Sequence, residues 1–109
     1  MLSYGLLGAL AACSSDPPAV ATVAATPELQ FVPGTVEIVA GGQVTWEFGS
    51  VPHNVFFTSG AQPPADIPDI TMNVSVSRTF PVGGTYDYEC RLHAGMTGQV
   101  TVKGSSTGY

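Results

Sequence analysis

The fold of this chain is decided by the stretch Thr85-Tyr86-Asp87-Tyr88-Glu89-Cys90. Apolar residues take every second position there, and polar residues lie between them. A period of two is that of a β-strand, whose successive side chains point to opposite faces of a sheet. We therefore predict a strand whose buried face carries Tyr86, Tyr88 and Cys90.

The same alternation recurs along most of the chain. Its apolar positions are Val36 and Ile38, then Val44, Trp46 and Phe48, then Val74 and Val76, and finally Val100 and Val102. Turn-forming residues separate these runs, as at Pro33-Gly34, Gly41-Gly42 and Gly83-Gly84. No stretch shows the 3.6-residue period of a long amphipathic helix. Short strands with turns between them predict an all-β fold, either a sandwich or a small barrel.

Residues 60–70 interrupt this strand pattern. They contain Pro63, Pro64 and Pro68, and proline cannot donate a hydrogen bond to a sheet. We predict a connecting loop that crosses between sheets at this point. The large apolar side chains expected in the core are Phe31, Trp46, Phe48 and Tyr88.

The composition limits the chain to a small domain and excludes one class of partner. Its 109 residues allow a single domain. Charged residues make up 10% of the chain, against a usual share of about 25%, and the formal net charge is −5. Binding to nucleic acid requires a basic face that displaces counterions, so no nucleic-acid partner is expected. No signal for an oligomer stands out, and a monomer is expected.

The N-terminal segment is predicted to be a targeting signal and not part of the folded domain. Residues 2–12 are apolar or small, but they are too few for a membrane-spanning helix, which needs about 20. The segment ends in Leu10-Ala11-Ala12-Cys13, which resembles the bacterial lipobox, where the cysteine is lipidated. Residues 1–13 are therefore expected to be a lipoprotein-type signal segment. A lipid on Cys13 would hold the protein on a membrane surface outside the cytoplasm, in the periplasm or at the cell surface.

The segment that follows, residues 14–26, is expected to be a tether. Its Pro17-Pro18 pair and small polar residues favour an extended chain. Within it, Val20–Ala25 is a candidate first strand. The folded domain is assigned to residues 27–104, and residues 105–109 are assigned to a short C-terminal tail.

Four residues have the chemistry and spacing of a copper site. Cys90, His93 and Met96 follow the strand described above, and the chain has only one other histidine, His53. Two imidazoles and a thiolate with a weak methionine ligand form a blue-copper site. Alone, Cys90 or Met96 is about as often a core residue as a ligand, because buried cysteine and methionine commonly fill cores, and His53 alone is more often a hydrogen-bonded surface histidine. It is the combination of all four that predicts copper.

The chain resembles the cupredoxins, in particular the branch of plastocyanin, pseudoazurin and amicyanin. The resemblance is carried by Val44-Thr45-Trp46, Pro52–Phe57 and Gly84–Cys90 together with His93 and Met96, and it spans residues 30–103. The short gap between the loop histidine and the methionine is similar to that of amicyanin. Amicyanins have a proline just before that histidine, and this chain has Leu92.

This resemblance implies a Greek-key β-sandwich of about eight strands with one copper ion, cycling between Cu(I) and Cu(II), near one end. The ligands would be His53, Cys90, His93 and Met96. Asn54 would brace the ligand loops and donate a backbone hydrogen bond to the Cys90 sulfur. The implied function is that of a mononuclear type 1 blue-copper electron-transfer protein, not an enzyme. Its partners would be redox proteins of the cytochrome c, dehydrogenase or oxidase type.

Other copper-binding classes fit less well. An extracytoplasmic module that stores or delivers copper is the alternative, but the Met-rich or His-rich runs of delivery proteins are absent from this sequence. A multicopper enzyme would need more than the two histidines present. A binuclear copper centre would need a second cysteine in the ligand loop, where position 94 is alanine. A domain that has lost its copper is disfavoured because all four ligands are present. Electron transfer is therefore the leading hypothesis.

Overall fold

Residues 17–104, which are those that the computed structural model describes, form nine strands and no helix. The strands are β1 (Val20–Ala25), β2 (Phe31–Val32), β3 (Thr35–Val39), β4 (Gly42–Phe48), β5 (His53–Phe57), β6 (Ile67–Thr71), β7 (Val74–Phe80), β8 (Gly84–Glu89) and β9 (Thr97–Lys103). No helix able to cross a membrane therefore occurs in this range. The predicted signal segment with Cys13 and the predicted C-terminal tail lie outside the described residues.

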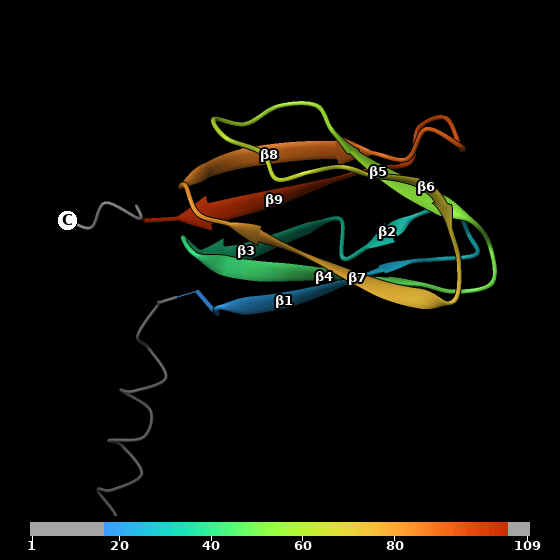
Figure 1. Cartoon of the computed structure of the whole chain (residues 1–109), viewed down its shortest axis with the longest axis horizontal. Coiled ribbons are helices and arrows are strands. Elements are labelled where there is room, and N and C mark those ends of the chain that lie inside the picture. The colour runs from blue at the N-terminus through green and yellow to red at the C-terminus, as the bar shows by residue number, and fades with distance from the viewer. Residues whose placement is uncertain (1–16, 105–109) are drawn as a thin grey trace, which may run out of the picture.

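The strands form two sheets that pack face to face (Figure 1). The four-stranded sheet has the order β2-β1-β4-β7, and the five-stranded sheet has the order β3-β9-β8-β5-β6. Two neighbouring pairs are parallel, β1 with β4 and β3 with β9, and the others are antiparallel. The prediction of an all-β sandwich is confirmed, with nine strands in place of about eight.

The register of the four-stranded sheet explains the alternation in the sequence. It aligns Val23, Trp46 and Val76 in one row across β1, β4 and β7. Val23 and Trp46 are fully buried between the sheets. On the outer face, the hydroxyl groups of Thr45 and Ser77 lie 2.7 Å apart. Each strand thus gives its apolar side chains to the core and its hydroxyl groups to the surface.

Aromatic rings occupy the centre of the core. Trp46 packs edge to face against Tyr88 and Phe57, with ring centroids 5.3 and 5.9 Å apart. Phe31 makes a similar contact with Tyr88 at 4.8 Å. Edge-to-face geometry is the arrangement that aromatic quadrupoles favour. The four residues assigned to the core from the sequence, which also include Phe48, are each no more than 5% exposed.

The prediction of a loop throughout residues 60–70 is wrong, because β6 begins at Ile67. β6 is an edge strand that pairs with β5 at His53↔Thr71 and Val55↔Ile67, with an irregular register between these pairs. An edge strand has one side without a partner, so the missing N–H of Pro68 is tolerated there. The residues before β6 form a loop, as expected.

The sandwich begins earlier than the domain boundary drawn from the sequence. β1 lies inside the range expected as a tether, at the position anticipated for a first strand. It occupies an interior place in its sheet, with β2 on one side and β4 on the other. The folded part therefore starts at Val20 and not at residue 27, because β4 needs β1 as a neighbour for its backbone hydrogen bonds.

Candidate metal centre

The sheet register brings two distant connections together at one end of the sandwich. β5 begins at His53 and β8 ends at Glu89. These strands are antiparallel neighbours, with Phe56 opposite Glu89. Continuing this register beyond the paired residues brings Asn54 opposite Arg91. The start of β5 and the loop after β8 therefore lie side by side, although the sequence separates them widely (Figure 1).

At this end three donor atoms converge. His53 Nδ1 lies 3.2 Å from His93 Nδ1, and the Cys90 sulfur lies 3.9 and 3.7 Å from these two nitrogens. The three atoms form a nearly equilateral triangle. His53 is fully buried, Cys90 is 4% exposed, and His93 is half-buried. Of the four predicted ligands, the structure thus brings three donor atoms into one cluster.

The tautomer of His53 follows from its second nitrogen. His53 Nε2 lies 2.9 Å from the backbone carbonyl oxygen of Thr26. A carbonyl only accepts hydrogen bonds, so Nε2 must carry the proton and Nδ1 presents its lone pair to the cluster. Burial lowers the pKa of His53, the hydrogen bond to Thr26 raises it, and His93 lowers it further. The net shift favours the neutral imidazole that a metal requires.

The loop from Cys90 to Met96 is closed by its own backbone. The Cys90 N–H donates to the Met96 carbonyl at 2.9 Å, and the Met96 N–H donates to the His93 carbonyl at 3.3 Å. Gly95 has a φ of 83°, a left-handed conformation that glycine adopts without strain. Met96 is 2% exposed, so the fourth predicted ligand is buried at the end of the same loop.

Asn54 braces the two connections, as the family resemblance implied. Its side-chain oxygen accepts a hydrogen bond from the Arg91 N–H at 2.7 Å, and Asn54 itself is 5% exposed. The Arg91 side chain lies over the Phe56 ring at 4.1 Å and pairs with Glu89 at 3.0 Å. The ligand loop is therefore fixed on both sides of Cys90. The backbone hydrogen bond from Asn54 to the Cys90 sulfur stays a prediction.

Sequence reasoning missed Thr26 and the contacts of Arg91. Thr26 acts on His53 through its backbone carbonyl, and a carbonyl is common to every residue type. No sequence pattern could therefore have pointed to it. The contact of Arg91 with Phe56 carried a weak signal, because both residues lie next to predicted ligand segments.

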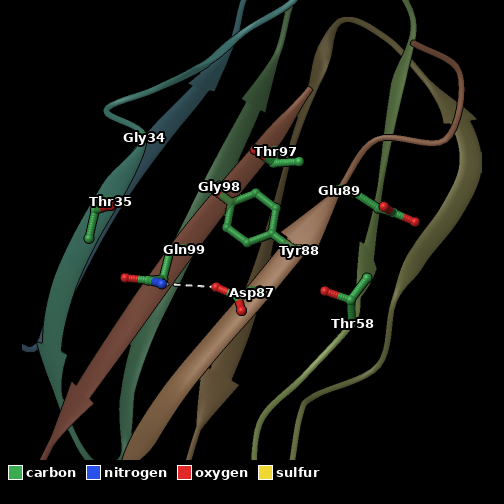
Figure 2. A pocket seen from close by; sticks show the side chains of 9 residues that line it. All are labelled: Gly34, Thr35, Thr58, Asp87, Tyr88, Glu89, Thr97, Gly98 and Gln99. Carbon is green, nitrogen blue, oxygen red and sulfur yellow. Dashed lines mark hydrogen bonds between the residues drawn. The ribbon is translucent and has the colours of Figure 1, made fainter. Parts of the chain in front are cut away.

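A concavity on the outer face of the five-stranded sheet is separate from the cluster (Figure 2). It is lined by residues of β8, β9 and the start of β3, and none of the predicted copper ligands lines it. Its carboxylate Asp87 accepts hydrogen bonds from Gln99 at 2.9 Å and from Ser59 at 3.0 Å. The other carboxylate in the lining, Glu89, pairs with Arg91 at 3.0 Å, so both carboxylates of the groove already have partners within the protein.

The chemistry of the cluster fits copper. The group found among residues 17–104 consists of two imidazole nitrogens and one sulfur, without a carboxylate. Hard cations such as Mg²⁺ and Ca²⁺ require oxygen ligands and do not fit. A trigonal arrangement of two histidines and one cysteine, with a methionine nearby, is the donor set of blue copper.

The chain belongs to the plastocyanin/azurin family of copper-binding proteins, whose family model matches residues 18–103. The fold and the cluster define the class as that of type 1 copper proteins, which hold one copper ion and carry electrons.

Particular relatives agree with this class. Amicyanin-alpha of Methylorubrum extorquens is 38% identical over 99 residues, which cover 88% of this chain and 82% of that protein. Plastocyanin of Scenedesmus fuscus is 40% identical over 86 residues, which cover 69% of this chain and 88% of that protein. Among solved structures, amicyanin of Paracoccus versutus has a TM-score of 0.65 and 31% identity, covering 83% of this chain and 87% of that one.

Proposed function

We propose that this protein carries single electrons between redox proteins outside the cytoplasm and does no bond chemistry of its own. In this proposal His53, Cys90, His93 and Met96 hold the copper ion. The observation that carries it is the triangle of His53 Nδ1, His93 Nδ1 and Cys90 Sγ, with sides of 3.2, 3.7 and 3.9 Å.

Copper, when bound, supplies a one-electron couple between Cu(I) and Cu(II). The chain's contribution is to hold the donor atoms still while the charge changes. Thr26 fixes the ring of His53, Asn54 fixes the loop beside Cys90, and the backbone bonds between Cys90 and Met96 close that loop. A scaffold fixed in this way reduces the rearrangement that accompanies each electron.

The ring of His93 provides the route to the surface. Its Nδ1 lies in the cluster, so the opposite ring edge faces away from it, and the residue is half-buried. The preceding residue Leu92 is 40% exposed. An apolar surface around the exposed edge suits a partner that docks weakly and leaves quickly. We expect partners of the cytochrome c, dehydrogenase or oxidase type.

Burial of the donors argues against a role in copper storage or delivery. His53 and Cys90 are 0% and 4% exposed, and their positions are fixed by neighbouring backbone and side chains. An exchangeable ion needs ligands that a recipient protein can reach. The electron-carrier function is therefore favoured over the alternative.

Attachment through a lipid on Cys13 is part of the proposal. β1 runs from Val20 toward Thr26, whose carbonyl contacts His53. The chain therefore enters the sandwich at the end opposite the metal cluster (Figure 1). An anchor that precedes β1 would leave the copper end free to meet partners away from the membrane.

The visible spectrum tests the copper site. Residues 14–109 loaded with Cu(II) should give an intense blue band that bleaches with ascorbate. Cys90→Ser should abolish the band, and Met96→Leu should shift it. Met72→Leu is the matched control, because Met72 is 44% exposed in the β6–β7 turn, and should leave the band unchanged. A folded, copper-loaded protein without this band would contradict the proposal.

A further inference from the structure

The carbonyl that holds His53 belongs to a three-residue hairpin turn in which a side-chain hydroxyl takes the place of one backbone acceptor. The turn links β1 to β2 through Pro27, Glu28 and Leu29. At its base, the Thr26 N–H donates to the Gln30 carbonyl at 2.9 Å, as in an ordinary antiparallel pair. The Gln30 N–H does not return the bond to the Thr26 carbonyl. It donates to the Thr26 hydroxyl at 3.3 Å.

This exchange leaves the Thr26 carbonyl free for other donors. A carbonyl oxygen has two lone pairs. One accepts the Leu29 N–H at 3.0 Å, and the other accepts His53 Nε2 at 2.9 Å. The Thr26 hydroxyl meanwhile donates its own proton to the Gln30 carbonyl at 3.1 Å. The hydroxyl therefore serves both backbone groups of Gln30, and the Gln30 N–H does not compete for the Thr26 carbonyl.

We propose that the Thr26 hydroxyl is a positioning group for the copper site, which acts on His53 by locking this turn and reserving the Thr26 carbonyl for the imidazole. The inference rests on the proposed role of His53 as a copper ligand. In this proposal the exposed turn between β1 and β2 sets the ring orientation and the tautomer of His53, which is buried and lies in the other sheet.

The rest of the turn explains why a lock is needed. Leu29 has a φ of 64°, a left-handed conformation that is unfavourable for a residue with a branched side chain. Leu29 is also 42% exposed, so packing alone does not hold it there. The far end of the turn is anchored at Phe31, which is 3% exposed and packs on Tyr88. The near end continues from Ala25 of β1, which is 3% exposed and pairs with Phe48 of β4. Between Ala25 and Phe31, the hydrogen bonds found in the turn all involve Thr26.

Substitutions at position 26 separate the hydroxyl from the rest of the side chain. Thr26→Val keeps the shape and removes the hydroxyl, whereas Thr26→Ser keeps the hydroxyl. Thr22→Val is the matched control, because Thr22 is exposed in β1, four residues before Thr26 and outside the turn. Two readouts are compared. One is the Cu(I) affinity measured against a chromogenic chelator, and the other is the ¹⁵N spectrum of the His53 ring in the metal-free protein.

For Thr26→Val we expect the Cu(I) affinity to fall about tenfold, the range typical of a lost partner of a metal ligand. We also expect the Nε2-protonated signal of His53 to broaden or to be replaced by a mixture of tautomers. Thr26→Ser should match the native protein in both readouts, and Thr22→Val should do so as well.

The inference is overturned if Thr26→Val behaves as Thr22→Val does in the ring spectrum and the affinity. Should Thr26→Val not fold, Thr26→Ala and Thr26→Ser form the decisive pair. A native protein that binds no copper would refute the proposed function instead. The His53 ring spectrum would still test the role of the hydroxyl in that case.

Discussion

Two buried polar atoms stand out among the described residues, Trp46 Nε1 and Tyr88 Oη, because neither makes a hydrogen bond of good geometry, although Trp46 is close enough to lower the Tyr88 pKa against the larger effect of burial. An unpaired buried group of this kind costs about 1–3 kcal/mol. The Tyr88 ring extends from β8 toward Gly98 on β9, where a Cβ atom would overlap its outer end (Figure 2). Packing, and not its hydroxyl, therefore fixes the place of Tyr88.

Tyr88→Phe should leave the protein as stable as before at pH 7, or more stable by about 1 kcal/mol, because it removes an unpaired hydroxyl. Burial raises the pKa of Tyr88 from 10.0 to about 12. The folded state then keeps a proton that the unfolded state loses, so stability falls as the pH rises from 10 toward 12. The expected loss from Tyr88 is about 2–3 kcal/mol.

Urea unfolding of the metal-free protein at pH 7, 10 and 11 measures this effect. The fall in stability between pH 10 and 11 should be smaller in Tyr88→Phe than in the native chain. Equal falls in the two proteins would show that Tyr88 does not titrate differently in the folded and unfolded states.

Gly98→Ala should destabilise the fold by about 1–3 kcal/mol, as overpacking in a core does. Its Cβ would collide with the ring of Tyr88, which has no space to move between Trp46 and Phe31. Gly49→Ala is the matched control, because a Cβ there has no neighbour within 4 Å. Thermal unfolding of both variants checks the prediction, and equal midpoints would contradict it.

At the scale of elements, the loop before β6 is tied to both sheets. From β7, Arg78 donates to the carbonyls of Ala65 at 2.7 Å and Asp66 at 2.9 Å. The Asp66 side chain accepts the Phe57 N–H of β5 at 2.8 Å. One arginine of the edge strand β7 therefore holds the loop before β6, and Asp66 of that loop in turn holds β5, the strand that begins with His53.

Arg78→Met should destabilise the protein by about 1–3 kcal/mol, because two carbonyls lose a charged donor. The Phe57 amide should exchange with solvent faster, since Asp66 is no longer held. Lys103→Met is the control: Lys103 forms one exposed ion pair at 3.5 Å, and such pairs contribute little. Hydrogen exchange and urea unfolding test both variants. An unchanged Phe57 exchange rate in Arg78→Met would refute the proposed link.

At the scale of the whole molecule, exposed apolar side chains gather on elements around the metal end. Leu92 lies in the ligand loop, Leu29 in the turn that holds His53, and Ile70 and Met72 flank the residue that pairs with His53. These four are each at least 40% exposed. Such a surface is typical of a site that binds another protein.

Leu92→Glu should slow electron exchange with a cytochrome c-type partner about tenfold, equivalent to about 1.4 kcal/mol, and leave the blue band intact. Val20→Glu makes the same charge change at an exposed apolar residue. Val20 is the first residue of β1, at the end of the strand away from the metal cluster, so this variant should not change the rate. Stopped-flow measurements belong at high ionic strength, where long-range steering by charge is screened. Equal rates for the two variants would remove Leu92 from the docking surface.

The sequence by itself determined the class of fold and the identity of the candidate ligands. Alternation with a period of two is a local property of the chain. The buried and exposed positions of β4, β8 and β9 follow the same alternation as the apolar and polar residues of their sequences. The donor chemistry of Cys90, His93 and His53 likewise belongs to the side chains themselves. These features need no knowledge of what lies beside them.

Only the tertiary structure decided which elements support those ligands. β6 forms despite Pro68 because β5 offers it an edge, and β1 joins the sandwich because it pairs with the side of β4 that β7 leaves free. Thr26 meets His53 across 27 positions of sequence. The physical reason is that a backbone carbonyl has the same chemistry at every residue, so its partner is set by proximity in space and leaves no mark in the sequence.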